Sequence, residues 1–176
     1  MRKLVAGLVL FAMVGCQRSV PVWSWNGLSL GMPFKDAAPI VQRLCGAEKP
    51  LRPAQFPEVE TSTIGCEASQ AELAGQRVGI TVQFYKDKIV VVTLSPPRET
   101  PQAWWQELEK SFDAKYGKSA DVSKDEKHAR EWKTKREWIR TNDYRSVAFA
   151  DLDALTKRTE AAKKLKAAKK SDNPAE

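Results

Sequence analysis

An alternating stretch from Arg77 to Tyr85 constrains the fold of this 176-residue chain more than any other feature. Every second residue is apolar, which is the pattern of a strand with one buried face. Those positions are Val78, Ile80, Val82 and Phe84. Lys86-Asp87 follow as a turn, and Ile89 to Leu94 is almost wholly apolar, as in a strand inside a sheet. We therefore expect a central β-hairpin that ends at Pro96-Pro97.

A helical pattern precedes this hairpin. The apolar residues that share one face of it are Phe34, Ala37, Ala38, Val41, Leu44 and Cys45. Gly46 is a plausible C-terminal stop. Pro39 is tolerated only if the regular helix begins near Asp36, and otherwise it kinks the helix. Residues 47–62 contain three prolines and predict a loop, followed by a short strand around Ile64 to Cys66.

The second half repeats this order. Thr100 can cap a helix with Pro101 at its first position and Gly117 after its end. Its apolar stripe contains Trp104, Trp105, Leu108, Phe112 and Tyr116. After a polar loop, one face of a long strand would hold Trp132, Thr134, Arg136 and Trp138. We expect a turn at Asn142-Asp143 and a return strand from Tyr144 to Ala150.

These elements predict an α+β fold. It would have two layers, with an antiparallel sheet and helices mainly on one face. The helix-hairpin plan would occur twice, over about residues 27–95 and 100–150. A basic C-terminal helix would begin at Asp151 or Asp153, whose carboxylates suit a helix start.

Residues 1–16 have the layout of a bacterial export signal. Arg2 and Lys3 precede an apolar run from Leu4 to Val14 that is too short to span a bilayer. Met13-Val14-Gly15-Cys16 resembles the lipobox of bacterial lipoproteins, which implies cleavage after residue 15 and a palmitate-bearing lipid on Cys16. An ordinary secreted protein cut nearby and an uncleaved anchor are the alternatives.

Without residues 1–15, the 176-residue chain keeps 161 residues, the size of one domain. We place a lipidated tether at 16–26, a single domain at 27–156 and a lysine-rich tail at 157–176. Cleavage would lower the formal charge from +7 to +5, because Arg2 and Lys3 are lost.

Cys45 and Cys66 remain as a pair once Cys16 carries lipid. In an oxidising compartment such a pair persists as a disulfide, which stabilises a fold by roughly 3 kcal/mol on a chain-entropy argument. Two cysteines with the single His128 make a poor zinc site, and a catalytic thiol needs a base that nothing in the sequence places. We expect the disulfide, no metal and no cofactor.

Seven lysines or arginines lie between Lys157 and Lys170, against one acid, Glu160. The first interpretation is a solvated helix end or a disordered tail. The alternative is contact with anionic lipid heads or acidic wall polymer. The candidate lysines for such contact are Lys163, Lys164, Lys166, Lys169 and Lys170. Nucleic acid is not an expected partner, because no basic stripe carries recognition motifs.

Trp23 and Trp25 alternate with Ser24 and would share one face of an extended segment. The favoured interpretation is a first strand that covers the core. The alternative places both indoles at the level of the lipid headgroups.

A family resemblance begins at Gly27. The segment G-L-S-L-G-M-P leads into the first helix, and Cys45, Cys66 and the hairpin from Phe84 to Val90 follow. This order resembles one repeat of the secreted β-lactamase inhibitor proteins, and is similar to the small lipoproteins of the outer-membrane β-barrel assembly machinery. The resemblance covers about residues 27–95 and implies a binding or scaffolding module without assigning binding residues. The assembly lipoproteins do not require this disulfide, and this chain adds a second helix-plus-hairpin and a lysine tail.

The sequence favours a non-enzymatic interaction protein. His128 is the single histidine, and the chain has no H-E-x-x-H motif and no phosphate-binding glycine loop. An inhibitor or immunity-type binder is the first alternative. Exposed indoles at Trp104, Trp105, Trp132 and Trp138 would favour it, although most are expected in the core. An envelope hydrolase is the second alternative.

The residue after the lipobox bears on localisation. In enterobacterial-type lipoproteins an aspartate there favours the inner membrane, whereas this chain has Gln17. We expect an anchor in the outer membrane that faces the periplasm. The expected partners are the membrane, through the lipid on Cys16, and an envelope protein whose identity the sequence does not reveal.

Overall fold

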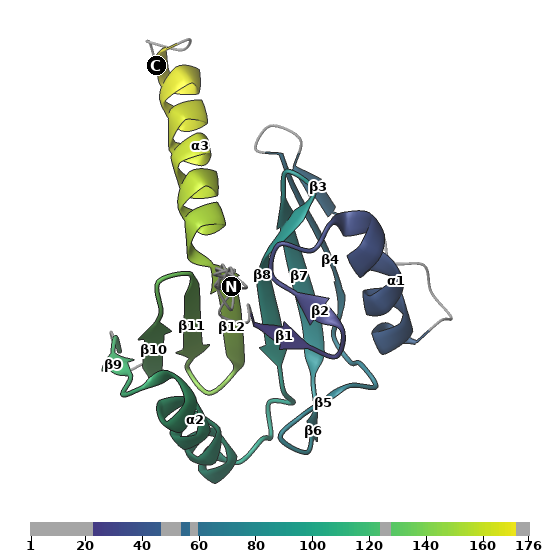
Figure 1. Cartoon of the computed structure of the whole chain (residues 1–176), viewed down its shortest axis with the longest axis vertical. Helices are drawn as coiled ribbons and strands as arrows, with labels where there is room; N and C mark the ends of the chain where they lie inside the picture. Colours follow the sequence, from purple (N-terminus) through teal and green to yellow (C-terminus); the bar gives the residue numbers. More distant parts are fainter. Residues whose placement is uncertain (1–22, 47–53, 57–59, 124–127, 172–176) are drawn as a thin grey trace, which may run out of the picture.

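The computed structural model of the chain describes residues 23–46, 54–56, 60–123 and 128–171 (Figure 1). It is an α+β fold with three helices and one large antiparallel sheet, which confirms the predicted fold class at this level. The predicted signal, Cys16 and the residues after Ser171 lie outside the described residues.

Eight strands form the sheet, and every neighbouring pair is antiparallel. Their spatial order is β3 (Ala54–Phe56), β4 (Thr61–Cys66), β7 (Gly79–Tyr85), β8 (Lys88–Ser95), β12 (Ser146–Asp151), β11 (Glu137–Asn142), β10 (Ala129–Lys133) and β9 (Ala120–Asp121). Two short hairpins stand apart from this sheet: β1 (Ser24–Trp25) with β2 (Leu28–Ser29), and β5 (Glu72–Leu73) with β6 (Gln76–Arg77).

The predicted central hairpin is present as β7 and β8. Its inward residues are nearly inaccessible, with Ile80 1% and Phe84 0% exposed. Lys86 and Asp87 have φ of 49° and 63°, the left-handed backbone that a two-residue hairpin turn requires. β8 then pairs with β12 on its other side, so that the apolar strand is enclosed as its composition predicts.

Helices α1 (Phe34–Cys45) and α2 (Gln102–Tyr116) share one core with the inward strand residues. Trp23, directly before β1, belongs to this core. Its indole stacks on Phe149 of β12 with ring centroids 4.4 Å apart, and the backbone N–H of Trp23 donates to the Glu137 carboxylate. Trp23 is 7% exposed and Trp25 of β1 is half-buried against the same core, in agreement with the interpretation that this segment covers the core.

Helix α3 (Leu152–Ser171) follows β12 directly and packs elsewhere. Ala154 and Leu155 contact a second apolar cluster, made by Val90, Val91, Ala148 and Ala150. Asp151 Oδ1 accepts the Ala154 N–H at 2.9 Å and so caps the helix. Figure 1 shows the remainder of α3 extending beyond the sheet.

The predicted Cys45–Cys66 disulfide is present. It joins the last residue of α1 to the last residue of β4, with the two Cα atoms 5.8 Å apart. Gly46 ends the helix with φ of 87°, as a left-handed C-terminal residue should.

The predicted long strand through Trp132 and Trp138 is wrong. The chain turns between β10 and β11, where Thr134 Oγ1 accepts the N–H groups of Arg136 and Glu137. Trp132 consequently lies in the core at 2% exposure, whereas Trp138 is half-buried beside the second cluster. The return strand begins later than predicted, at Ser146, because the turn includes residues 143 and 144 with positive φ.

Two predictions about helix starts are also wrong. Thr100 does not cap α2; Pro101 occupies the N-cap position, and no side chain caps the helix. Helix α1 begins at Phe34, so Pro39 lies inside it and removes the N–H that would bond the carbonyl of Lys35. The predicted loop at 47–62 contains β3 and the start of β4, and the short strands β5, β6 and β9 were not predicted.

Candidate functional site

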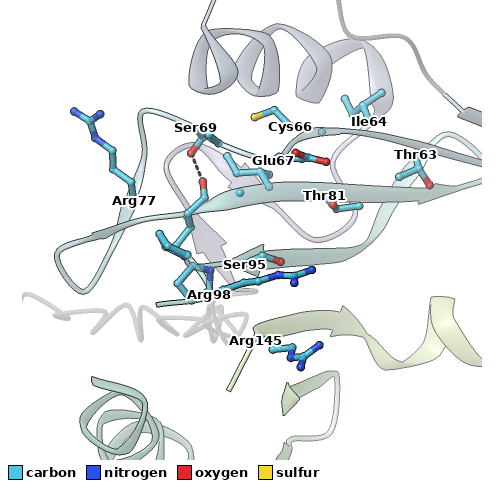
Figure 2. Close-up of a pocket in the computed structure, with 17 residues that line it drawn as sticks. Thr63, Ile64, Cys66, Glu67, Ser69, Arg77, Thr81, Ser95, Arg98 and Arg145 are labelled. Atoms are coloured by element: carbon cyan, nitrogen blue, oxygen red, sulfur yellow. Dashed lines mark hydrogen bonds between the residues drawn. The ribbon is translucent and has the colours of Figure 1, made fainter. Parts of the chain in front are cut away.

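A depression of about 990 Å³ lies where β4 ends and β7 begins (Figure 2). The loop after β8 and the β11–β12 turn complete its lining. We call it the arginine groove, after Arg77, Arg98 and Arg145, which all line it. Its elements are distant in sequence and meet only because β8 pairs with β12.

Two of the residues that line the groove are glycines, Gly65 and Gly79. A Cβ atom on Gly65 would lie 2.0 Å from the carbonyl oxygen of Ile80. A Cβ atom on Gly79 would lie 2.5 Å from the carbonyl oxygen of Glu67. Only glycine lets these backbone segments approach so closely.

The charge of the groove is positive. Arg98 is exposed and forms no hydrogen bond or ion pair with any residue that the structure describes. The Arg145 Nε atom lies 3.6 Å from Asp143 Oδ2, and the Arg145 side chain is 71% exposed. Glu67 is the one carboxylate in the lining. Figure 2 shows Arg98 and Arg145 reaching the same side of the groove, whereas Arg77 points away from them.

A second depression, of about 220 Å³, shares Arg98 and Arg145 with the groove. Thr100, Gln102 and Tyr144 also line it, so it lies at the start of α2. The first turn of α2 carries no acidic residue. The Thr100 hydroxyl is buried and has no hydrogen-bond partner in the described chain. Both features leave positive charge and donors at the border of the two depressions.

A buried polar network joins α2 to β10 and β11. Glu109 Oε1 accepts the Thr141 hydroxyl at 2.9 Å and lies 2.8 Å from His128 Nε2. The imidazole stacks on Tyr144 with ring centroids 4.3 Å apart, and Gln102 Nε2 donates to the Tyr144 hydroxyl at 3.1 Å. His128, which sequence analysis treated as isolated, therefore has a buried carboxylate partner.

The predicted lysines lie on α3, which does not line the groove. Lys163, Lys164 and Lys166 are exposed on α3. Lys169 and Lys170 belong to the same helix, and their side chains lie outside the described part, as does Cys16. Strand β12 runs from the groove at its Ser146 end to α3 at its Asp151 end, so the helix and the groove occupy opposite ends of the strand (Figure 1).

One hydrolase-like pattern, G-x-S-x-G, is present at Gly27 to Gly31. A nucleophile elbow requires a strand, a sharp turn and then a helix. Ser29 instead lies in the short strand β2, opposite Ser24. His128 bonds Glu109 and not this serine. The pattern therefore has no catalytic context in the described chain.

The tryptophans named for the inhibitor alternative divide into two groups. Trp105 and Trp132 are 0% and 2% exposed, so they serve the core. Trp104 and Trp138 are half-buried and pack against the apolar clusters. The Trp104 indole N–H also donates to the Ala74 carbonyl at 2.9 Å. None of the four is a fully exposed aromatic anchor.

Within residues 23–46, 54–56, 60–123 and 128–171, no cluster of three or more histidine, cysteine or acidic side chains could hold a metal ion. No helix in that part of the chain is long and apolar enough to cross a membrane. Comparison with protein-family models, with curated proteins and with solved structures finds no match. The resemblance to inhibitor and assembly proteins therefore stays a prediction from the residues.

Proposed function

We propose that the protein is a lipid-anchored, non-enzymatic interaction or scaffolding protein of the bacterial cell envelope. The observation that carries the proposal is the arginine groove. Three arginines and one glutamate are among the described residues that line it, and no histidine is. Such a surface suits recognition of a partner better than bond-making chemistry, which needs a positioned base.

The proposed anchor would hold the domain near the membrane. Seven residue steps separate Cys16 from Trp23, which packs in the core. A fully extended chain of that length reaches about 25 Å. With a lipid on Cys16, the domain would therefore remain close to the bilayer surface, and Gln17 favours the outer membrane with the domain in the periplasm.

The projecting part of α3 would supply a second contact. Its exposed lysines can approach anionic lipid heads or acidic wall polymer, each contributing up to about 1 kcal/mol. A solvated helix end remains the alternative, and removal of these lysines distinguishes the two.

A repeated, two-layer architecture would explain the shape of the molecule. Each half has a helix preceded by proline and followed by glycine, at Pro33 and Gly46 in α1 and at Pro101 and Gly117 in α2. Each helix leads into four strands of one sheet, and the strand orders mirror each other across the β8–β12 pair. These correspondences support the proposal that the helix-hairpin plan occurs twice.

An inhibitor or immunity-type binder is the alternative within the same class. Exposed tryptophans would favour this alternative, and the burial of Trp105 and Trp132 weakens the support for it. The positive groove would then have to supply the interface. An envelope hydrolase has less support still, since neither Ser29 nor His128 has a catalytic arrangement.

Crosslinked affinity capture from cells tests the proposed function. The full chain is compared with Cys16→Ser, after labelling with an alkyne fatty acid. We expect label on the parent alone, and one envelope protein in near-equal amount to the parent. Label on both chains would contradict the anchor. Recovery of lipid and wall material alone would contradict a dedicated protein partner, and its loss on deletion of 163–176 would assign that binding to α3.

A further inference from the structure

We propose that the arginine groove binds an extended acidic segment of a protein partner, with a carboxylate of that segment held by Arg98 and Arg145. This inference rests on the proposed function and names the chemistry of the partner. Arginine is suited to this role because its planar guanidinium donates two parallel hydrogen bonds to one carboxylate.

The guanidinium groups of Arg98 and Arg145 are not neutralised by a close carboxylate in the described chain. Arg98 has no carboxylate partner in the described chain, and the exposed Arg145 has only the half-buried Asp143 at 3.6 Å. The two side chains border both depressions, so an anion placed between them meets donors from two strand ends at once. Three arginines and one carboxylate, that of Glu67, line the groove, so its net charge is positive.

The lining of the groove follows two strands of the sheet. In Figure 2, Thr63, Ile64 and Cys66 follow one another along β4, Ser69 continues in the loop after it, and Thr81 lies beside them on β7. Gly65 and Gly79, which have no side chains, are among the residues that line the groove. Pro96 and Pro97, which have no N–H groups, line the groove beside Ser95 and Arg98. A depression that is lined along a strand in this way suits an extended polypeptide.

The position of the groove relative to α3 favours a peptide over a lipid surface. The groove lies at the Ser146 end of β12, whereas α3 and its lysines continue from the Asp151 end (Figure 1). If the α3 lysines contact the membrane, the groove faces the periplasm, where protein segments are accessible.

Fluorescence anisotropy tests the inference on the mature full chain. The probe is a fluorescein-labelled peptide of alternating glutamate and serine, and its control replaces glutamate by glutamine. We expect Arg98→Gln combined with Arg145→Gln to weaken binding of the glutamate peptide at least about tenfold, since charged hydrogen bonds are lost. The matched double variant Arg43→Gln with Arg136→Gln removes equal charge elsewhere and should change binding less than twofold.

Several results would overturn the inference: no binding of the glutamate peptide to the parent, equal binding of both peptides, or equal weakening by both double variants. Vesicles with phosphatidylglycerol form a further arm. Loss of vesicle binding on the groove substitutions, without any effect on the peptide, would assign the arginines to lipid. All four substituted side chains are at least partly exposed, so unchanged circular dichroism and melting temperature are expected in both variants.

Crosslinked capture separates the two proposals. If an envelope protein accompanies the parent and the groove variant equally, the acidic-segment inference fails and the proposed function stands. If no envelope protein accompanies the parent, the proposed function fails, whatever the peptide shows.

Discussion

Glu109 of α2 and His128 before β10 lie in direct contact, with Oε1 and Nε2 2.8 Å apart and the side chains 12% and 21% exposed. The same carboxylate oxygen accepts the Thr141 hydroxyl. A carboxyl group is tolerated inside a protein when its hydrogen bonds offset the free-energy cost of removing it from water. This contact therefore orders the second half of the sheet against its helix.

We expect Glu109→Ala to lower the free energy of unfolding by about 2–3 kcal/mol, because Thr141 and His128 lose their partner inside the protein. Urea unfolding at neutral pH measures this. The matched control is Glu107→Ala on the same helix, whose exposed pair with Lys110 is expected to contribute under about 0.5 kcal/mol. Equal effects of the two substitutions would contradict a stabilising role for the buried network.

Replacing Cys45 by serine should lower the free energy of unfolding by roughly 3 kcal/mol, because the unfolded chain gains the freedom that the disulfide removes. The measurement is urea unfolding under oxidising conditions. The parent with excess reductant should unfold like the variant without it. An unchanged melting temperature for Cys45→Ser would show that the bridge contributes nothing.

A side chain at Gly65 should be costly. Its Cβ would lie 2.0 Å from a backbone carbonyl oxygen that cannot move without disturbing β7. We expect Gly65→Ala to destabilise the protein by about 3 kcal/mol. The control is Gly75→Ala, where no atom lies within 4 Å and the positive φ of 78° alone costs about 1 kcal/mol. Thermal melting of both variants decides the order.

Asp113 should contribute stability that depends on pH. Desolvation would raise the pKa of its carboxyl, but hydrogen bonds from Trp132 Nε1 and the Ser119 N–H outweigh this and lower the pKa below the ordinary 3.8. A lowered folded-state pKa means that the contribution is present above pH 3.8 and lost as pH falls through the folded-state pKa. The stability difference between the parent and Asp113→Asn should therefore shrink below about pH 4. A constant difference from pH 7 to pH 2.5 would contradict it.

Deletion of residues 163–176 should leave the fold intact. Helix α3 contacts the apolar cluster through Ala154 and Leu155 and bonds Gln83 through Arg158, all of which lie before the deleted residues. We expect a change under about 0.5 kcal/mol in the free energy of unfolding. Leu155→Ala is the positive control and should cost more than the deletion. Unfolding of the truncated chain would show that the distal helix belongs to the core.

Local patterns in the sequence determined much of this protein. The alternation from Arg77 to Tyr85 predicted β7, and Ile80 and Phe84 are buried in the core. Apolar spacing and Gly46 predicted α1, and two cysteines predicted the disulfide. These predictions succeed because strand alternation, helical faces and stop residues act over neighbouring residues, whose chemistry the sequence states directly.

Tertiary structure decided where those elements meet. The turn after Lys133 places Trp132 and Trp138 in different clusters, because the Thr134 hydroxyl bonds the backbone there. No local pattern distinguished Arg98 and Arg145 from other exposed arginines. They share one groove only because β8 pairs with β12, and such long-range pairing depends on the packing of the whole sheet and not on any single segment.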